Sequence, residues 1–159
     1  MVRLDKITPG KGLTIKYKGL VDFSKLYKDL HTWLLDRKYM FQEKEHNDAT
    51  KDKGREIGVR WESERIADDY AKYIITVRIS ASEMQKMEKL DYANISIEIE
   101  GTVALDYSNK WQAKSFNNFL FKLYNKFVIK KKIGIYYSNL YKEVTEFYNT
   151  AKSILDMYS

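Results

Sequence analysis

Hydrophobic and polar residues alternate with a period of two along four stretches of the chain. The stretches are residues 13–21, 57–62, 73–81 and 95–105. In the first of them Leu13, Ile15 and Tyr17 fall on one side, and lysines fall on the other. Period two is the spacing of a β-strand with one buried and one solvated face. Four such strands predict an antiparallel sheet that is dry on one face only.

A helical pattern follows the first predicted strand. Apolar residues between positions 23 and 34 recur at intervals of three and four, which predicts an amphipathic helix. Asp22 or Ser24 can cap its N-terminus, because a short polar side chain there accepts a hydrogen bond from a free backbone N–H. We expect the helix to end near Arg37–Lys38, where positive charge suits a helix C-terminus.

The last third of the chain predicts two further helices. An apolar stripe consists of Phe116, Leu120, Leu123, Tyr124 and Phe127. The basic run Lys130–Lys132 and Gly134 follow it, and a first helix is expected to end there. The final helix carries apolar residues that are separated alternately by three and four positions, which is the spacing of a heptad seam. They are Tyr137, Leu140, Val144, Phe147, Ala151, Ile154 and Tyr158. Tyr141, Tyr148 and Leu155 widen this seam on one flank.

The remaining segments connect these elements. Residues 42–55 are polar without a period, which predicts a long surface loop or a loop between two strand ends. Residues 67–69 fit a turn between two strands, whereas residues 82–90 fit either a short amphipathic helix or an extension of the preceding strand followed by a loop. The predicted fold is a single α+β domain over residues 1–159. It is a two-layer sandwich whose antiparallel sheet of about four or more strands is covered on one face by an N-terminal helix and two C-terminal helices.

Composition narrows the possible chemistry. The 159 residues include no cysteine, which excludes disulfides, thiolate metal sites and thiol catalysis. The chain lacks a signal-peptide pattern and an apolar run near the roughly 20 residues of a spanning helix, so a cytoplasmic location is expected. The first and last thirds are basic around an acidic middle, a pattern that can mark an anionic partner. The last third carries lysine and no arginine, which disfavours bidentate phosphate contacts.

No catalytic, cofactor or metal motif is recognisable. The segment 9–12, Pro-Gly-Lys-Gly, lacks phosphate-loop spacing and precedes a strand. Acidic and basic residues are interleaved on the predicted solvated face, which is typical of cross-strand ion pairs. These residues are Lys16, Lys18, Arg60, Glu62, Glu64, Lys72, Arg78, Glu98 and Glu100. Another polar group consists of Glu43, Glu45, His46, Asp48 and Asp52, and its order does not match a calcium loop. We therefore expect no metal and no cofactor. The sequence favours a non-enzymatic protein, and an enzyme stays open because catalytic residues need not be close in sequence.

The function that these features favour is association, with a protein partner or with a second copy of the chain. The final helix is the expected contact, because an aromatic heptad seam can serve a partner as well as the core. The candidate interaction residues are Tyr137, Leu140, Val144, Phe147, Ile154 and Tyr158. The sequence does not identify the partner or the oligomeric state.

Two alternatives remain open. The order of strand, helix, antiparallel strands and long final helix resembles helix-grip proteins, although the strand count is low. That resemblance implies a small hydrophobic ligand held in a cavity between the sheet and the final helix. The second alternative is a nucleic-acid-binding protein, with Lys130, Lys131 and Lys132 as candidate anion contacts beside Tyr136 and Tyr137.

Overall fold

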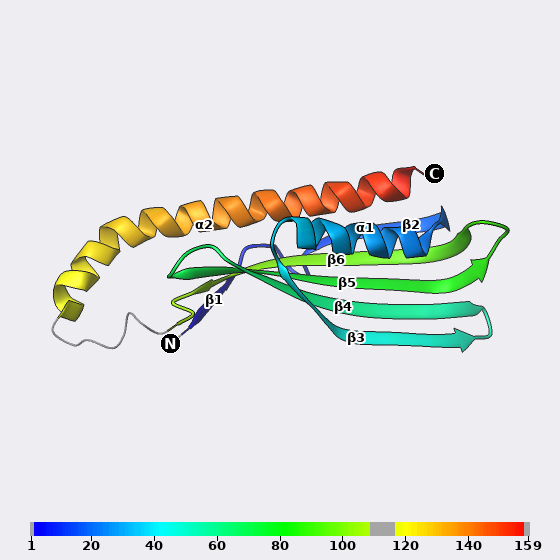
Figure 1. The fold of residues 1–159 in the computed structure, drawn as a ribbon, viewed down its shortest axis with the longest axis horizontal. Coiled ribbons are helices and arrows are strands. Elements are labelled where there is room, and N and C mark those ends of the chain that lie inside the picture. The colour runs from blue at the N-terminus through cyan, green and yellow to red at the C-terminus, as the bar shows by residue number, and fades with distance from the viewer. Residues whose placement is uncertain (1, 109–116, 158–159) are drawn as a thin grey trace.

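A computed structural model describes residues 2–108 and 117–157 of the chain. In this part it has one six-stranded antiparallel sheet and two helices (Figure 1). The elements are β1 (Arg3–Lys6), β2 (Leu13–Val21), α1 (Phe23–Asp36), β3 (Met40–Lys51), β4 (Gly54–Ile66), β5 (Ala71–Lys86), β6 (Asp91–Leu105) and α2 (Asn117–Asp156). The α+β class and the antiparallel sheet predicted from the sequence are thus confirmed.

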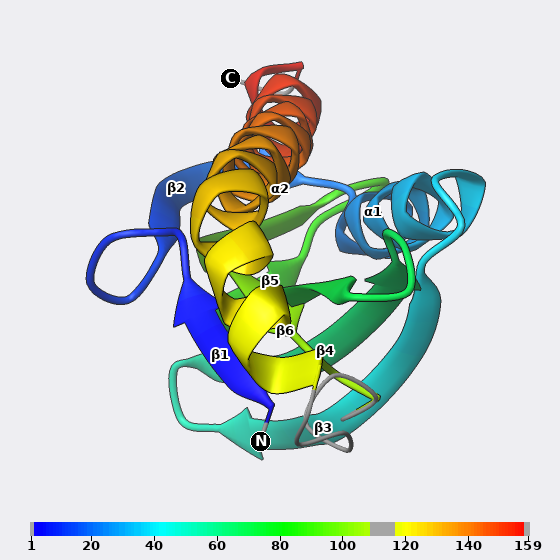
Figure 2. The same ribbon diagram turned by 90° about the vertical axis from the view of Figure 1, so that its left-hand side faces the viewer.

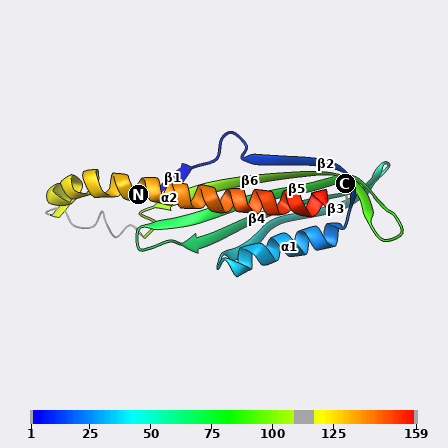
Figure 3. The same cartoon turned by 90° about the horizontal axis from the view of Figure 1, so that it is seen from above.

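The sheet is a meander of β3 to β6, and the N-terminal strands β1 and β2 both pair with its last strand, β6. Strands β3, β4, β5 and β6 pair in chain order, each antiparallel to the next. On the other side of β6 lie both β2, which pairs along residues 91–99, and β1, which pairs along residues 102–105. The two sheet edges are therefore β3 on one side and β1 with β2 on the other (Figure 3).

Both helices lie over the same face of the sheet, which we call the inner face (Figures 1 and 2). Helix α1 lies beside β3, and α2 runs over β6 and β2. The alternation in the sequence places apolar side chains on this face, and the central strands are fully covered there. Side chains with no more than 1% exposure include those of Trp61, Ile75, Val77, Ile79, Ile97 and Ile99. The predicted register of buried and solvated positions is correct along β4, β5 and β6.

Local signals placed the first helix correctly. Asp22 is its N-cap, and its carboxylate accepts a hydrogen bond of 3.1 Å from the backbone N–H of Lys25. The helix ends at Asp36, one residue before the predicted positive end at Arg37. The turn predicted at residues 67–69 also lies between β4 and β5, so that prediction is confirmed. Strand β5 continues to Lys86, which decides in favour of the extended strand for the ambiguous segment.

The prediction of a loop over residues 42–55 is wrong. Strand β3 covers most of this segment, and only a two-residue turn separates it from β4. The alternation that reveals a strand arises from one buried face, and β3 is an edge strand that is exposed along nearly its whole length. Because β3 has polar residues on both faces, its sequence shows no alternation of apolar and polar positions, and the strand is not recognised from the sequence. Strand β1 has only four residues, too few for a period to be recognised.

The predicted break between two C-terminal helices is also wrong, because α2 is continuous from Asn117 to Asp156. Glycine within a helix costs about 1 kcal/mol relative to alanine, which is too little to end a long helix. A Cβ at Gly134 would meet no atom within 4 Å, so close packing does not require glycine at this position. Phe116 and Tyr158 lie outside the described residues. The side chains of Leu120, Leu123, Tyr124 and Phe127 are likewise outside them.

Candidate functional site

Most of the seam predicted on the final helix lies in the protein core. Leu140, Val144 and Phe147 are 0% exposed, and Ile154 is 8% exposed. The ring of Phe147 packs edge-on against Trp33 of α1, with the ring centroids 5.1 Å apart. These side chains hold α2 to its own sheet and to α1. An association through α2 would therefore use the faces of the helix that this seam leaves free.

Tyr137 lies at the border of that core. Its side chain is half-buried, and its hydroxyl donates a hydrogen bond to a carboxylate oxygen of Asp5 on β1. Partial burial raises the pKa of the Tyr137 hydroxyl, and the Asp5 carboxylate raises it further. One helical turn on, Tyr141 is 48% exposed. Arg3 and Asp5 are the β1 residues that face α2, because they pair with the inward-facing Leu105 and Val103 of β6.

A groove separates β1 from this side of α2, and we call it the β1–α2 groove. Its volume is about 710 Å³. Its lining combines strand β1 and the residue after it with little more than one turn of helix α2: Arg3, Leu4, Asp5, Lys6, Ile7, Tyr137, Ser138 and Tyr141. Tyr141 is 48% exposed, so part of its aromatic side chain stands open to solvent here.

Strand β1 presents an unpaired edge along this groove. Within the described residues it pairs with β6 and with no other strand. The backbone N–H of Ile7 donates to the carbonyl of Gly101 on β6, at 2.9 Å. Alternate residues of an antiparallel strand bond the same neighbour, so the backbone groups of Leu4 and Lys6 are directed away from β6. An unpaired strand edge of this kind can pair with another chain.

The lysine run predicted as an anion contact lies on the same helix, N-terminal to the groove. Lys130, Lys131 and Lys132 are exposed, and no carboxylate in the described part of the chain forms an ion pair with them. Lys130 precedes Tyr137 by seven residues, which is two helical turns, so both residues lie on the same side of α2. Positive charge therefore extends along the helix from the end of the groove by about 10 Å.

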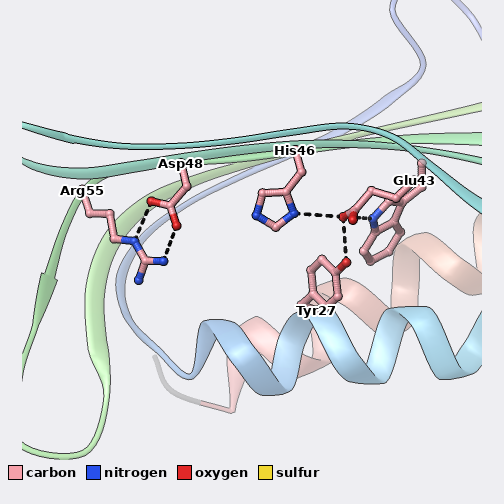
Figure 4. Close-up of polar contacts among 6 residues, drawn as sticks. Tyr27, Glu43, His46, Asp48 and Arg55 are labelled. Atoms are coloured by element: carbon pink, nitrogen blue, oxygen red, sulfur yellow. Dashed lines mark hydrogen bonds and ion pairs between the residues drawn. The ribbon is translucent and has the colours of Figure 1, made fainter.

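A second group of functional side chains lies between α1 and the edge strand β3 (Figure 4). The Glu43 oxygen Oε1 accepts hydrogen bonds from the Tyr27 hydroxyl at 2.7 Å and from the Trp61 Nε1 at 3.3 Å. The His46 Nδ1 lies 3.3 Å from the same oxygen. Because Tyr27 is on α1 and the other residues are on β3 and β4, the carboxylate fastens the helix to the edge of the sheet.

Burial and hydrogen bonding act in opposite directions on Glu43. Partial burial alone would raise its pKa, but the donors Tyr27, Trp61 and His46 outweigh this effect, and the pKa of Glu43 is lowered. Burial and the hydrogen bond to Glu43 raise the pKa of Tyr27 to about 12. At neutral pH the carboxylate is therefore charged and the phenol is neutral, which is the pairing that a stable hydrogen bond needs.

The structure divides the polar residues that the sequence placed in one loop. Glu43, His46 and Asp48 point from β3 toward α1, whereas Glu45 lies on the opposite face and pairs with Arg60 at 3.3 Å. No three of the acidic and histidine side chains in residues 2–108 and 117–157 form a group that could hold one metal ion. His31, distant in sequence, belongs to the same region, because its ring lies 4.2 Å from that of Phe41.

Comparison with known proteins does not indicate a function for this chain, so the function is inferred from the geometry of the structure. No protein-family model, no curated protein and no solved structure matches the chain. Among the described helices, none combines the length and apolar character needed to cross a membrane. The α1–β3 cluster is internally satisfied and joins two elements. The β1–α2 groove, in contrast, has open apolar surface and unpaired backbone, which makes it the candidate functional site.

Proposed function

We propose that this protein is an interaction module that binds an extended segment of a partner protein in the β1–α2 groove. The observation that carries the proposal is the combination of an unpaired strand edge with a helix wall on either side of one groove. A segment in extended conformation can add to a strand edge through its backbone, while alternate side chains enter the groove beside it.

The geometry favours a peptide over a compact ligand. Leu4 and Lys6 direct backbone donors and acceptors along the groove, and such a row is matched by another strand. The apolar walls of Tyr137 and Tyr141 face a segment in that position, and aromatic residues are enriched where protein partners bind. The predicted role of the aromatic C-terminal helix in association is retained in this proposal, with Tyr137 and Tyr141 in place of the buried seam.

The charge of the surface favours an acidic segment. The Arg3–Asp5 pair and the Lys6–Glu100 pair balance the charges at the groove itself. The lysines at positions 130–132 form no ion pair among the described residues, although Lys132 lowers the pKa of Asp68. Of the three, Lys130 lies on the same side of α2 as Tyr137. Acidic residues on one flank of a bound segment would therefore meet this run. Exposed charges of this kind mainly accelerate association, so binding should weaken as salt is added.

A small hydrophobic ligand is the competing function, because helix-grip proteins hold such ligands between sheet and final helix. The β1–α2 groove does lie between a strand and that helix. However, the space directly beneath α2 is filled by its own seam, where Leu140, Val144 and Ala151 are 0% exposed. A groove bordered by strand backbone offers such a ligand little enclosure, whereas pockets usually bury most of a ligand's surface.

Selection of peptides from a random library displayed on phage, with the full-length protein as target, tests the proposal. Selected peptides should be extended and acidic at one end. Leu4→Pro should weaken their binding at least tenfold, because it removes a backbone donor at the free edge and keeps the bonds to β6. Leu4→Ala is the matched control, since it alters the side chain alone and should change the affinity less than threefold.

Two results would contradict the proposal. Peptides that bind Leu4→Pro as tightly as the original protein would show that the strand edge is not used. A failure to select any peptide, together with saturable binding of an apolar fluorescent dye that Tyr141→Lys abolishes, would instead support the small-ligand function at the same groove. Circular dichroism of each variant checks that folding is unchanged.

A further inference from the structure

The outer face of the sheet, opposite the helices, contains a depression that neither helix nor groove explains. Five neighbouring strands each contribute one residue to a row that crosses the sheet, and four of the five side chains are small. Strand register places them in the order Asn47, Gly58, Ser80, Ser96 and Lys16, on β3, β4, β5, β6 and β2. We call this row the outer furrow. With strands about 4.8 Å apart, it extends about 19 Å.

Two adjoining hollows follow the outer furrow and share Ser80 and Ser96. One has a volume of about 260 Å³ and the other about 350 Å³. Longer side chains stand around them: Lys16, Lys18, Glu45, Arg60, Arg78 and Glu98. The depression is thus floored by hydroxyl, amide and backbone groups and rimmed by charge. Four of these rim residues are basic and two are acidic.

Gly58 in the floor has no internal explanation. A Cβ at this position would meet no atom within 4 Å, and its backbone does not adopt the left-handed conformation that requires glycine. Glycine inside a strand is unfavourable, since it loses more conformational freedom on folding than other residues. Such a glycine often marks a bulge or a place where a ligand or another backbone approaches closely. The register shift of β4 lies between Arg55 and Ile57, and Gly58 itself is regularly paired with Asn47 and Ser80.

The charges of the rim point to an anionic group at one end of the outer furrow. Arg60 lies 3.3 Å from Glu45, and Arg78 lies 3.4 Å from Glu100, so both arginines have acidic partners. Lys16 and Lys18 are exposed, and in the described part of the chain neither forms an ion pair. They stand beside Ser82, Asn94 and Ser96, whose side chains supply neutral hydrogen-bonding groups. A phosphate can bind the lysines while hydroxyl groups bind the serine and asparagine side chains.

We propose that the outer furrow binds a small, hydroxyl-rich molecule that carries a phosphate group, such as a sugar phosphate or a nucleotide. The phosphate lies against Lys16 and Lys18, and the hydroxyl-bearing part lies over Gly58 and Ser80. This site is on the opposite face of the sheet from the partner groove, so it is independent of the proposed peptide binding. The binding of either molecule can be lost without loss of the other.

Titration of the protein with ribose 5-phosphate, ribose and inorganic phosphate tests the site, with backbone amide shifts as the readout. Ribose 5-phosphate should shift the amides of Asn47, Gly58, Ser80 and Ser96 saturably, and more tightly than either fragment. Gly58→Gln should fill the depression and weaken binding at least tenfold. Lys16→Gln should weaken it similarly. Lys89→Gln, at an exposed lysine in the turn between β5 and β6, is the control and should change the affinity less than twofold.

Three results would overturn the proposal. The first is the absence of saturable shifts up to about 10 mM ligand, beyond which binding is too weak to be specific. The second is a set of shifts centred on residues 130–132, which would place the phosphate on α2. The third is equal binding of phosphate and ribose 5-phosphate, which would leave the hydroxyl groups without a role. Unchanged unfolding midpoints in the variants exclude misfolding as the cause of lost binding.

Discussion

Glu143 joins three parts of the fold, and its removal gives a sharp test of the structure. Its oxygen Oε2 accepts a hydrogen bond of 2.6 Å from the hydroxyl of Tyr39, which precedes β3. Its oxygen Oε1 lies 2.6 Å from the guanidinium of Arg65 at the end of β4. Glu143 itself is on α2, so one carboxylate connects the long helix to the end of β4 and to the residue that precedes β3. We expect Glu143→Ala to lower the free energy of unfolding substantially.

The magnitude follows from burial. The side chains of Arg65 and Glu143 are 25% and 18% exposed, and Tyr39 is 2% exposed. A hydrogen bond to a charged group contributes about 1.5–3 kcal/mol, and an unpaired buried donor adds a further penalty. In the variant Arg65 retains its hydrogen bond to the Arg37 carbonyl and its stacking over Tyr39. The loss in the free energy of unfolding is therefore smaller than the sum for two separate hydrogen bonds to a charged group. We expect about 3 kcal/mol, or a fall in Tm of about 6–12 °C for a chain of this size.

Urea unfolding followed by circular dichroism measures this effect. Lys142→Ala is the matched control, since it removes an exposed neighbour on the same helix and should cost less than about 0.5 kcal/mol. Glu143→Gln keeps an acceptor for Tyr39 and loses the charge that Arg65 needs, so it should fall between the two. If Glu143→Ala costs no more than Lys142→Ala, solvent replaces the carboxylate and the reasoning about this junction is refuted.

The remaining predictions address the core, the pH dependence and the outer face. Val144→Asp should abolish cooperative unfolding, because it places a charge at a 0% exposed site, whereas Tyr141→Asp should leave the unfolding midpoint nearly unchanged. The folded-state pKa of Tyr27 is raised to about 12, and that of Tyr39 is also raised. Each tyrosine therefore contributes stability that is complete below pH 10, its unfolded-state pKa. Above pH 10 the free energy of unfolding declines by about 1.4 kcal/mol per pH unit for each tyrosine, until the pH reaches the folded-state pKa. Urea unfolding from pH 9 to 12 measures this decline, and a stability that does not change with pH would contradict it. Gly58→Thr should raise the free energy of unfolding by about 0.5–1 kcal/mol, and a decrease would show that glycine is needed for packing.

The sequence predicts those parts of the fold that have one buried face. Strands β4, β5 and β6 alternate visibly because their inner side chains, such as Val77 and Ile97, are completely covered. Strand β3 lies at the margin of the sheet and carries the polar residues Glu43 and His46 on its inner face, where α1 leaves them partly solvated. Its sequence therefore shows no alternation of apolar and polar residues. The hydrogen bonds that place these polar groups are made to α1 and β4. Such contacts depend on tertiary structure, which local patterns do not encode.

The candidate site was predictable only on its helical side. Tyr137 and the lysines at 130–132 stand out in the sequence, because an aromatic seam and a basic run are local features. Their partner across the groove, β1, is identified by its pairing with β6, about 100 residues away in the chain. Similarly, the five residues of the outer furrow come from five strands, and only Gly58 is unusual in its own segment. A site assembled by sheet register has no signature in a single stretch of sequence.

Helix α2 carries its core contacts and the proposed contact with a partner on two different faces. The face formed by Leu140, Val144 and Phe147 is buried in the core, and substitutions there are expected to destabilise the fold. The adjoining face carries Tyr141, which is 48% exposed and makes the wall of the groove. A helix with a narrow seam would serve only one of these purposes, whereas the second aromatic row widens the apolar surface beyond what the sheet covers. Variants of Tyr141 and of Val144 should therefore differ in kind, the first losing a partner in a folded protein and the second losing the fold itself.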